Sequence, residues 1–145
     1  MDITYKEATT LPEFIDAIRL RVEVFIKEQG FQPGWEPDED DKAGRSFIAQ
    51  VDGRVIATAR ARQSKKGEFK IERLATAKAF RGHGVGSGLI QFILKELLKQ
   101  KPKRIWMQSQ VQAKGFHEKH GFKIVSKPYD HYGVEHVDME YSKLA

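Results

Sequence analysis

The sequence contains no cysteine. This absence excludes a disulfide framework, a thiolate metal site and a cysteine nucleophile, and it fits a reducing compartment. The chain also lacks any run that approaches the roughly 18 consecutive apolar residues of a membrane-spanning helix. Its first ten residues, MDITYKEATT, contain no apolar signal segment. We therefore expect a cytoplasmic protein with no membrane partner.

Repeats and low-complexity linkers are also missing from the 145 residues. A chain of this length has the size of one ordinary domain and can bury a hydrophobic core. Hydrophobic residues make up 40% of the chain and charged residues 31%, which is typical of a soluble globular protein and not of a disordered one. We therefore expect a single domain that spans residues 1–145.

The net charge is +5 and the isoelectric point is about 9.4. A modest basic excess favours an anionic partner such as nucleic acid, anionic lipid or a phosphorylated small molecule, although it also serves solubility alone. Basic residues gather at 60–73 and 95–104, whereas carboxylates dominate 36–41. The basic segments do not alternate with aromatic residues, and the carboxylates oppose a wide nucleic-acid footprint. We expect no nucleic-acid partner.

Hydrophobic periodicity predicts the elements of the fold. A capping box of Thr10 and Glu13 opens a predicted helix at 11–25. The dipeptide Asp52-Gly53 predicts a hairpin between strands 46–51 and 54–62. The other predicted elements are a strand at 68–76, a helix at 85–99, a strand at 104–109, a short helix at 112–120, and two closing strands at 122–127 and 134–142, joined through PYDHYG. This order predicts a mixed α/β (α+β) domain with a largely antiparallel sheet and one parallel pair between 68–76 and 104–109.

Four glycines alternate with other residues where the strand at 68–76 leads into the following helix: Gly82, Gly84, Gly86 and Gly88. Backbone N–H groups at a helix start have no partner within the helix, and glycines let a phosphate approach them. We therefore favour a phosphate-binding turn over the alternative of a flexible turn with close helix packing. The P-loop, dinucleotide-binding and nucleophile-elbow patterns all fail to fit this spacing.

Arg81 and the glycines after it match the R/Q-x-x-G-x-G/A signature of the GCN5-related N-acetyltransferases. The segments IERLAT and AKGFHEKHGF resemble the fourth strand and a later helix segment of this family. The segments LRVEVFIKEQG and PYDHYGVEHVDM are similar to a bacterial subfamily called ElaA-like or YjcF-like. The resemblance covers most of the chain. It implies a central sheet that is splayed in the middle and flanked by helices.

The resemblance implies acetyl-CoA as the co-substrate and no metal. The amides of the glycine turn would bind its pyrophosphate, and the end of the preceding strand would pair with the pantetheine arm as an added strand. An amide near Leu74 would polarise the thioester carbonyl. The residues implied at the cofactor site are Leu74, Ala75, Thr76, Arg81, Gly82, His83, Gly84, Val85, Gly86, Ser87 and Phe116. The family usually has an apolar residue where Thr76 stands.

Two residues are our candidates for catalysis. Glu72 lies two residues before Leu74, so strand alternation predicts that both side chains share a face. We expect Glu72 to be the general base; the alternative is a surface glutamate paired with Arg73 or Lys70. His117 stands where the family commonly has a tyrosine near the sulfur, so we expect it to act as the acid; the alternative is a histidine on the helix surface.

The acceptor site is predicted from the subfamily pattern EQ…D…D and from EHVDM. These motifs imply contacts from Glu28, Gln29, Asp38 and His136, whereas Glu39 and Asp40 are expected to lie in a solvated loop. For Asp38 the alternative is the same solvated loop, and for His136 it is a histidine bonded within the sheet. Trp35 is either a hydrophobic lid or core. His117 and His120 have no third ligand for a metal.

The resemblance implies an N-acetyltransferase that moves an acetyl group directly to a primary amine of a small molecule or peptide. The lack of cysteine makes an acyl-enzyme less simple than direct transfer. The alternative function is a non-catalytic acyl-CoA-binding or sensing domain, which the histidine in place of the tyrosine motivates. A C-terminal strand at the sheet edge would permit a homodimer.

Overall fold

One mixed sheet positions the rest of the molecule in the computed structural model, which describes residues 1–144. Its strands are β1 (Thr4–Glu7), β2 (Arg45–Val51), β3 (Arg54–Lys65), β4 (Glu68–Thr76), β5 (Arg104–Gln110), β6 (Phe122–Ile124), β7 (Tyr129–His131) and β8 (Val134–Tyr141). The strand order is β1-β2-β3-β4-β5-β8-β6, and β7 also pairs with β8. Only the β4–β5 pair is parallel. The expected mixed, largely antiparallel fold is confirmed.

Three α-helices flank this sheet: α1 (Leu11–Arg21), α2 (Val85–Leu98) and α3 (Lys114–Glu118). The predicted capping box is present, because the amide of Glu13 donates to the Thr10 hydroxyl at 3.3 Å and the Thr10 amide donates to the Glu13 carboxylate at 3.1 Å. After α1 the chain continues as a π-helical segment, η1 (Val22–Glu28), so the helical region extends past the predicted end at residue 25. No helix within residues 1–144 has both the length and the apolar character needed to cross a membrane.

Two strands escaped prediction. β1 is four residues long and has no extended apolar alternation of its own; it forms by pairing with β2. β7 lies in the segment expected to be a connection, where Tyr132 (φ 54°) and Gly133 (φ 81°) make the turn of a hairpin with β8. β8 is therefore flanked by β5 on one side and by β6 and β7 on the other. The expectation of a C-terminal strand at the sheet edge is wrong.

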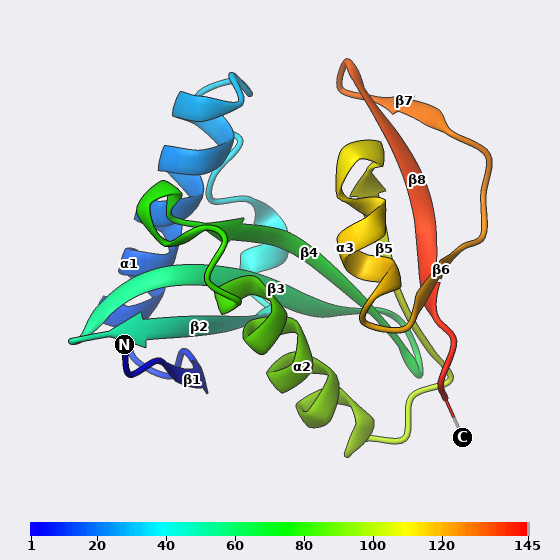
Figure 1. The fold of residues 1–145 in the computed structure, drawn as a ribbon, viewed down its shortest axis with the longest axis horizontal. Coiled ribbons are helices and arrows are strands. Elements are labelled where there is room, and N and C mark those ends of the chain that lie inside the picture. The colour runs from blue at the N-terminus through cyan, green and yellow to red at the C-terminus, as the bar shows by residue number, and fades with distance from the viewer. Residues whose placement is uncertain (145) are drawn as a thin grey trace.

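The sheet splits between β4 and β5. The two strands pair only from Glu68 with Arg104 to Lys70 with Trp106, and beyond these three residue pairs they diverge (Figure 1). Beyond this point β4 remains paired with β3, whereas β5 remains paired with β8. The register between β3 and β4 shifts at Arg73, whose φ of 58° marks a bulge. The expected splay is confirmed, and it leaves one edge of β4 without a neighbouring strand.

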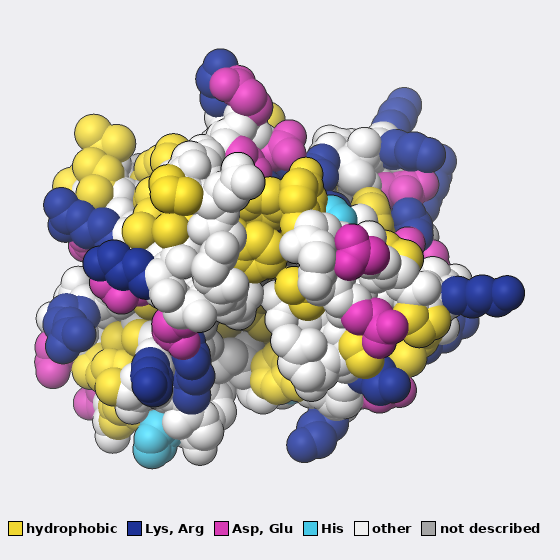
Figure 2. Space-filling view, turned by 90° about the horizontal axis from the view of Figure 1, so that it is seen from above, with side chains coloured by type: hydrophobic (Ala, Val, Ile, Leu, Met, Phe, Trp, Pro, Cys, Tyr) yellow, Lys and Arg dark blue, Asp and Glu magenta, His cyan; other side chains and the backbone are white. Residues whose placement is uncertain are grey.

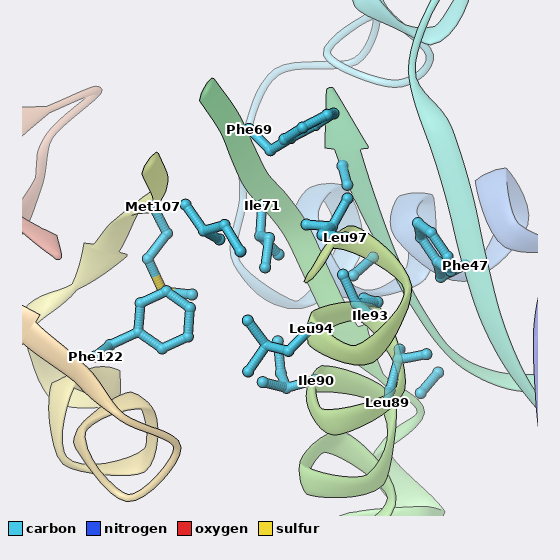
Figure 3. Packing of buried hydrophobic residues seen from close by; sticks show 14 of the residues in the cluster. Phe47, Phe69, Ile71, Leu89, Ile90, Ile93, Leu94, Leu97, Met107 and Phe122 are labelled. Atoms are coloured by element: carbon cyan, nitrogen blue, oxygen red, sulfur yellow. The ribbon is translucent and has the colours of Figure 1, made fainter. Parts of the chain in front are cut away.

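Helix α2 packs against both halves of the divided sheet. Leu89, Ile90, Ile93 and Leu97 are completely buried along one face of the helix, as the apolar stripe predicted. Figure 3 shows these side chains among residues from both halves of the sheet, with Phe47 on one side, Met107 and Phe122 on the other, and Phe69 and Ile71 above them. Full burial of each such side chain contributes about 1.5–3 kcal/mol. Helix α1 contacts β3, and its side chains meet the opposite face of the sheet.

The last of the four alternating glycines has a packing role. A Cβ on Gly88 would lie 2.1 Å from the hydroxyl of Tyr5 on β1, so the helix approaches β1 too closely for any side chain there. The close-packing alternative is thus correct for Gly88.

We predict that Gly88→Ala lowers the free energy of unfolding by about 1–3 kcal/mol, because the Tyr5 ring must move to accept the methyl group. Thermal and urea unfolding measure the change. The matched control is Gly115→Ala on α3, where the new Cβ would meet no atom within 4 Å and helix propensity improves. A Gly88→Ala protein as stable as the control would contradict the packing role.

Candidate active site

A cavity of about 230 Å³ lies where β4 and β5 separate. Its walls come from η1 and the loop after it, β4, α2, β5, α3 and the β7–β8 hairpin. Figure 2 looks down on this region and shows a hollow with hydrophobic side chains at its centre, between the two halves of the molecule. The split in the sheet therefore provides an open, partly apolar site of the size of a small ligand.

The cavity has two chemically different sides. Ile71, Leu74 and Met107 face the core around α2, and His117 of α3 lines the cavity with them. The other side carries polar residues of the opposite strand faces: Lys70, Glu72, Gln108, Gln110 and His136. We call the first the apolar side and the second the polar side. The gap between β4 and β5 thus combines an apolar wall with a polar wall.

Glu72 and Leu74 do not share a face of β4. Glu72 stands directly opposite Arg60 and Ala75 opposite Thr58, so the bulge at Arg73 and Leu74 inverts the alternation. Leu74 consequently packs with the core around α2, whereas Glu72 lies on the polar side. The predicted pairing of these two side chains is wrong because one extra residue in a strand reverses every side chain beyond it.

Glu72 is held by cations on three sides. Its Oε2 accepts hydrogen bonds from Arg60 and from Nε of Arg62 at 2.8 Å, and its Oε1 lies 3.2 Å from Nζ of Lys70. Burial alone would raise the pKa of this carboxyl, but Arg62, Arg60 and Lys70 together lower it to about 2. A carboxylate that releases its proton so readily is a weak base. The ion pair with Lys70 that the alternative named is present, and the structure gives Glu72 the environment of an ion-pair partner and not of the expected general base.

The acidic segment 36–41 is folded inward as part of the same network. Arg21 is 1% exposed and donates to Glu36 and, through two nitrogens at 2.9 Å each, to Asp41. Arg73 lies 2.6 Å from Glu36 and donates to Asp38 at 3.0 Å. These ion pairs fasten the segment to α1 and β4.

Asp38 was predicted at the acceptor site, but the structure pairs it elsewhere. Its carboxylate accepts from Arg60 at 2.6 Å and from Arg73, and it does not line the cavity. Glu39 and Asp40 are exposed, as expected for them. Burial would raise the pKa of Asp41, yet Arg21, the Asp38 amide and Arg60 lower it to about 2.

Trp35 joins the two halves of the molecule across the cavity. Phe31 stacks on its ring at 5.1 Å, Cζ of Arg73 lies 4.7 Å from it, and the ring of Tyr132 meets it edge-on at 4.4 Å. Tyr132 belongs to the β7–β8 turn. Trp35 is thus a bridge that covers the cavity and not a core residue.

The glycine turn presents open backbone donors. Gly82 and Gly84 have φ values of 80° and 78°, a left-handed conformation that favours glycine. Gly84 caps α2 without a side-chain hydrogen bond, and the first helical bond runs from the Gly88 amide to the Gly84 carbonyl at 3.0 Å. The amides of Val85, Gly86 and Ser87 therefore precede the first helical hydrogen bond, at the positive end of the helix dipole.

Arg81 and Glu28 hold this turn against the N-terminal region. Arg81 donates to the Thr76 carbonyl at 2.9 Å and to both Glu28 oxygens at 2.9 and 2.8 Å. Glu28, predicted as an acceptor ligand, therefore lies outside the cavity. Gln29 does line the cavity and accepts a hydrogen bond from Gln110 of β5 at 3.0 Å.

His117 is buried in the cavity wall. Its Nδ1 has no hydrogen-bond partner among residues 1–144. Burial, and then the nearby His120, lower the pKa of His117 to about 4, so the ring is neutral at pH 7. Phe116 lies against the glycine turn, 3.4 Å from where a Cβ of Gly86 would stand. Within the described part of the chain, no group of three or more ligating side chains could hold a metal.

His136 lines the polar side of the cavity, as the sequence predicted. Its Nδ1 lies 2.8 Å from the carbonyl oxygen of Val134, and its ring is 4.9 Å from that of His131 and 6.3 Å from that of Tyr129. Lys70, Gln108 and His131 also line the cavity, although we predicted no acceptor role for them. The alternation of β5 could have identified Gln108, because its neighbours Met107 and Ser109 are buried on the other face.

The sequence and the fold of this chain resemble those of proteins whose family is known. Residues 4–143 match the family model of the acetyltransferase (GNAT) domain. The chain therefore belongs to the GNAT acetyltransferases. The uncharacterized N-acetyltransferase YjcF of Bacillus subtilis (strain 168) is 30% identical over 125 residues, which cover 86% of this chain and 89% of YjcF.

Solved structures share the fold of this chain. The crystal structure of Escherichia coli ElaA has a TM-score of 0.87 at 23% identity and covers 97% of this chain and 100% of that chain. A GNAT family acetyltransferase from Elizabethkingia anophelis, with acetyl-CoA bound, has a TM-score of 0.64 at 17% identity and covers 95% and 94% of the two chains. The expected likeness to the ElaA-like and YjcF-like members is confirmed.

The ion-pair network predicts acid sensitivity. The pKa of Glu72 is lowered from 4.5 to about 2 in the folded protein, so its contribution to stability is present above pH 4.5 and is lost as the pH falls toward 2. We predict that Glu72→Gln lowers the free energy of unfolding at pH 7 by about 2–4 kcal/mol and flattens its decline at acid pH. Urea unfolding from pH 7 to pH 2.5 measures both effects. The control is Glu39→Gln, an exposed carboxylate of the acidic segment 36–41; an equal effect of both changes would contradict the prediction.

Proposed function

We propose that the protein is an N-acetyltransferase that moves the acetyl group of acetyl-CoA directly to a primary amine of a small molecule or peptide. One observation carries this proposal: the open amides at the start of α2 lie at the end of β4, where a Cβ on Gly86 would stand 3.6 Å from Oγ1 of Thr76 and 3.4 Å from Phe116 of α3. Membership of the GNAT family supports acetyl transfer, and the neighbour from Elizabethkingia anophelis with acetyl-CoA bound supports the identity of the donor.

The cofactor is bound mainly by backbone in this proposal. The amides from Arg81 to Ser87, together with the α2 dipole, hold the pyrophosphate. The pantetheine arm pairs with Leu74, Ala75 and Thr76 as an added strand, because their edge of β4 has lost β5 as a neighbour. The exposed side chain of His83 borders the turn, and Phe116 forms a wall beside Gly86.

The thioester lies in the gap, at the bulge of β4. The Leu74 amide leaves the regular ladder at this bulge and polarises the thioester carbonyl in our proposal. His117 is neutral and buried, so in our proposal its unpartnered nitrogen donates a hydrogen bond to the departing sulfur and does not act as the acid expected from the sequence. This role corresponds to that of the tyrosine in other members of the family. Glu72 keeps the surrounding cations in place on the acceptor side.

The acceptor enters on the polar side of the cavity. Gln29 and His136 line that side, whereas Glu28 and Asp38 act from outside, through Arg81 and Arg73. A non-catalytic acyl-CoA-binding or sensing function remains the second candidate, and the buried histidine in place of a tyrosine favours it.

The glycine turn makes the binding step testable. We predict that Gly84→Val lowers the affinity for acetyl-CoA by more than about tenfold, because the new side chain stands where a phosphate would approach the amides. Isothermal titration calorimetry measures the affinity. The matched control is Gly53→Val in the β2–β3 turn, which has a similar φ of 76° and equally open surroundings, and which separates backbone strain from blocked binding. Unchanged affinity in Gly84→Val would contradict this location.

Turnover distinguishes the two candidate functions. We predict that the wild-type protein releases thiol from acetyl-CoA when members of a panel of amino sugars, amino acids, polyamines and peptides are added. His117→Phe should slow this release by about 10²-fold without weakening acetyl-CoA binding, because the ring is preserved in size but cannot donate to sulfur. Tight binding of acetyl-CoA without release for any amine would instead support the sensing function.

A further inference from the structure

The acceptor amine needs a proton acceptor that Glu72 cannot provide. An alkylamine carries a proton below a pH of about 10 and must lose it before it attacks. The titratable and charged groups that line the polar side are Lys70, Glu72, Arg73, His131 and His136. Lys70 and Arg73 are cations, and Glu72 is fully engaged by Arg60, Arg62 and Lys70. The proton acceptor on this side is therefore a histidine.

His136 is fixed in the tautomer that a base requires. A carbonyl oxygen can only accept a hydrogen bond, so the contact of 2.8 Å with Val134 places the ring proton on Nδ1. Nε2 then carries a lone pair. This atom has no hydrogen-bond partner among residues 1–144 and is not one of their enclosed polar atoms, so it is accessible, on a side chain that lines the cavity.

The surroundings of His136 hold the ring in one orientation. The side chain is 6% exposed, stands opposite Gln110 where β5 has separated from β4, and stacks on Tyr129. Tyr129 is itself anchored, because its hydroxyl donates to Asp138 at 2.5 Å. Within the described chain, His131 has no hydrogen bond that selects a tautomer, so its ring is not fixed as that of His136 is.

We propose that Nε2 of His136 takes the proton from the acceptor amine. This inference rests on the proposed acetyl transfer and deepens it. The ammonium gives one proton to Nε2; the free amine then forms a C–N bond with the thioester carbonyl carbon, and the C–S bond breaks. The thiolate takes the second amine proton as the acetamide forms, and Nε2 of His136 releases the first proton to solvent. The products are the acetamide, coenzyme A and one proton to solvent.

The tautomer is measured without any acceptor. Long-range ¹H–¹⁵N spectra of the histidine-labelled protein, with the His136 signals assigned from the spectrum of His136→Asn, report which nitrogen carries the proton. We expect Nδ1–H with an unprotonated Nε2. An Nε2–H tautomer would overturn the assignment of His136 and would leave the proposed function untouched.

Catalysis is tested with acceptors that differ only in protonation. The probes are an alkylamine that the wild-type protein acetylates and its β,β-difluoro analogue, which has nearly the same shape but is mostly neutral at the assay pH. His136→Asn keeps a donor near the position of Nδ1 and removes Nε2. We expect kcat/KM to fall by about 10²-fold for the alkylamine and far less for the fluorinated amine.

A purely structural role would give a different pattern. Equal losses for both amines, no loss at all, or a protonation-dependent loss in His131→Asn but not in His136→Asn would each overturn the proposal. Absence of turnover by the wild-type protein with every amine would overturn the proposed function together with this inference. Calorimetry with acetyl-CoA confirms that each variant still folds and binds the donor.

Discussion

The parallel pairing of β4 with β5 lasts for three residue pairs, and the chemistry of the protein depends on where it stops. Beyond Lys70 the two strands diverge, β4 paired with β3 and β5 paired with β8. Ile90 and Leu94 of α2 fill one side of the gap between them. The loss of pairing exposes a strand edge that a ligand can complete. The separation also leaves the cavity residues of β4, β5 and β8 around an open gap. Continuous pairing of β4 with β5 would have closed this gap. The bulge at Arg73 then turns Leu74 toward one side of the gap and Glu72 toward the other.

The arginine–carboxylate network determines two properties of the polar side of the cavity: the position of the loop that carries Trp35, and the low pKa of Glu72. Burying Arg21 and Arg60 costs desolvation free energy that only well-placed carboxylates offset, so each of these arginines contacts at least two of them. The network fastens the loop that carries Trp35 over the cavity, and Trp35 in turn meets the β7–β8 turn through Tyr132. The same ion pairs depress the pKa of Glu72. The ion pairs that hold the Trp35 loop over the cavity are therefore the same ones that make Glu72 a weak base.

Local sequence determined what could be predicted. Features that depend on a few neighbouring residues were predicted correctly, and the structure contains each of them. They are the capping box at Thr10, the Asp52-Gly53 hairpin, the apolar stripe of α2 and the glycine turn. The short strands β1 and β7 depend on partners elsewhere in the chain, so their own residues carry too little periodicity. The bulge at Arg73 follows from the register with β3. Glu72 and Asp38 lie 12 and 22 residues away from Arg60 along the chain, which is why the sequence did not show that Arg60 pairs with both.

The two cavity histidines suit opposite ends of one transfer because their environments differ. His117 lies on the apolar side, where burial and His120 keep it neutral and leave a nitrogen without a partner. His136 lies on the polar side, where a backbone carbonyl orients it and leaves the other nitrogen open. The two rings come from α3 and β8, on opposite sides of the gap, so in the proposed transfer His136 takes a proton from the amine on one side while His117 donates a hydrogen bond to sulfur on the other. The division of the sheet would thus place these two proposed roles on opposite sides of a thioester in the gap.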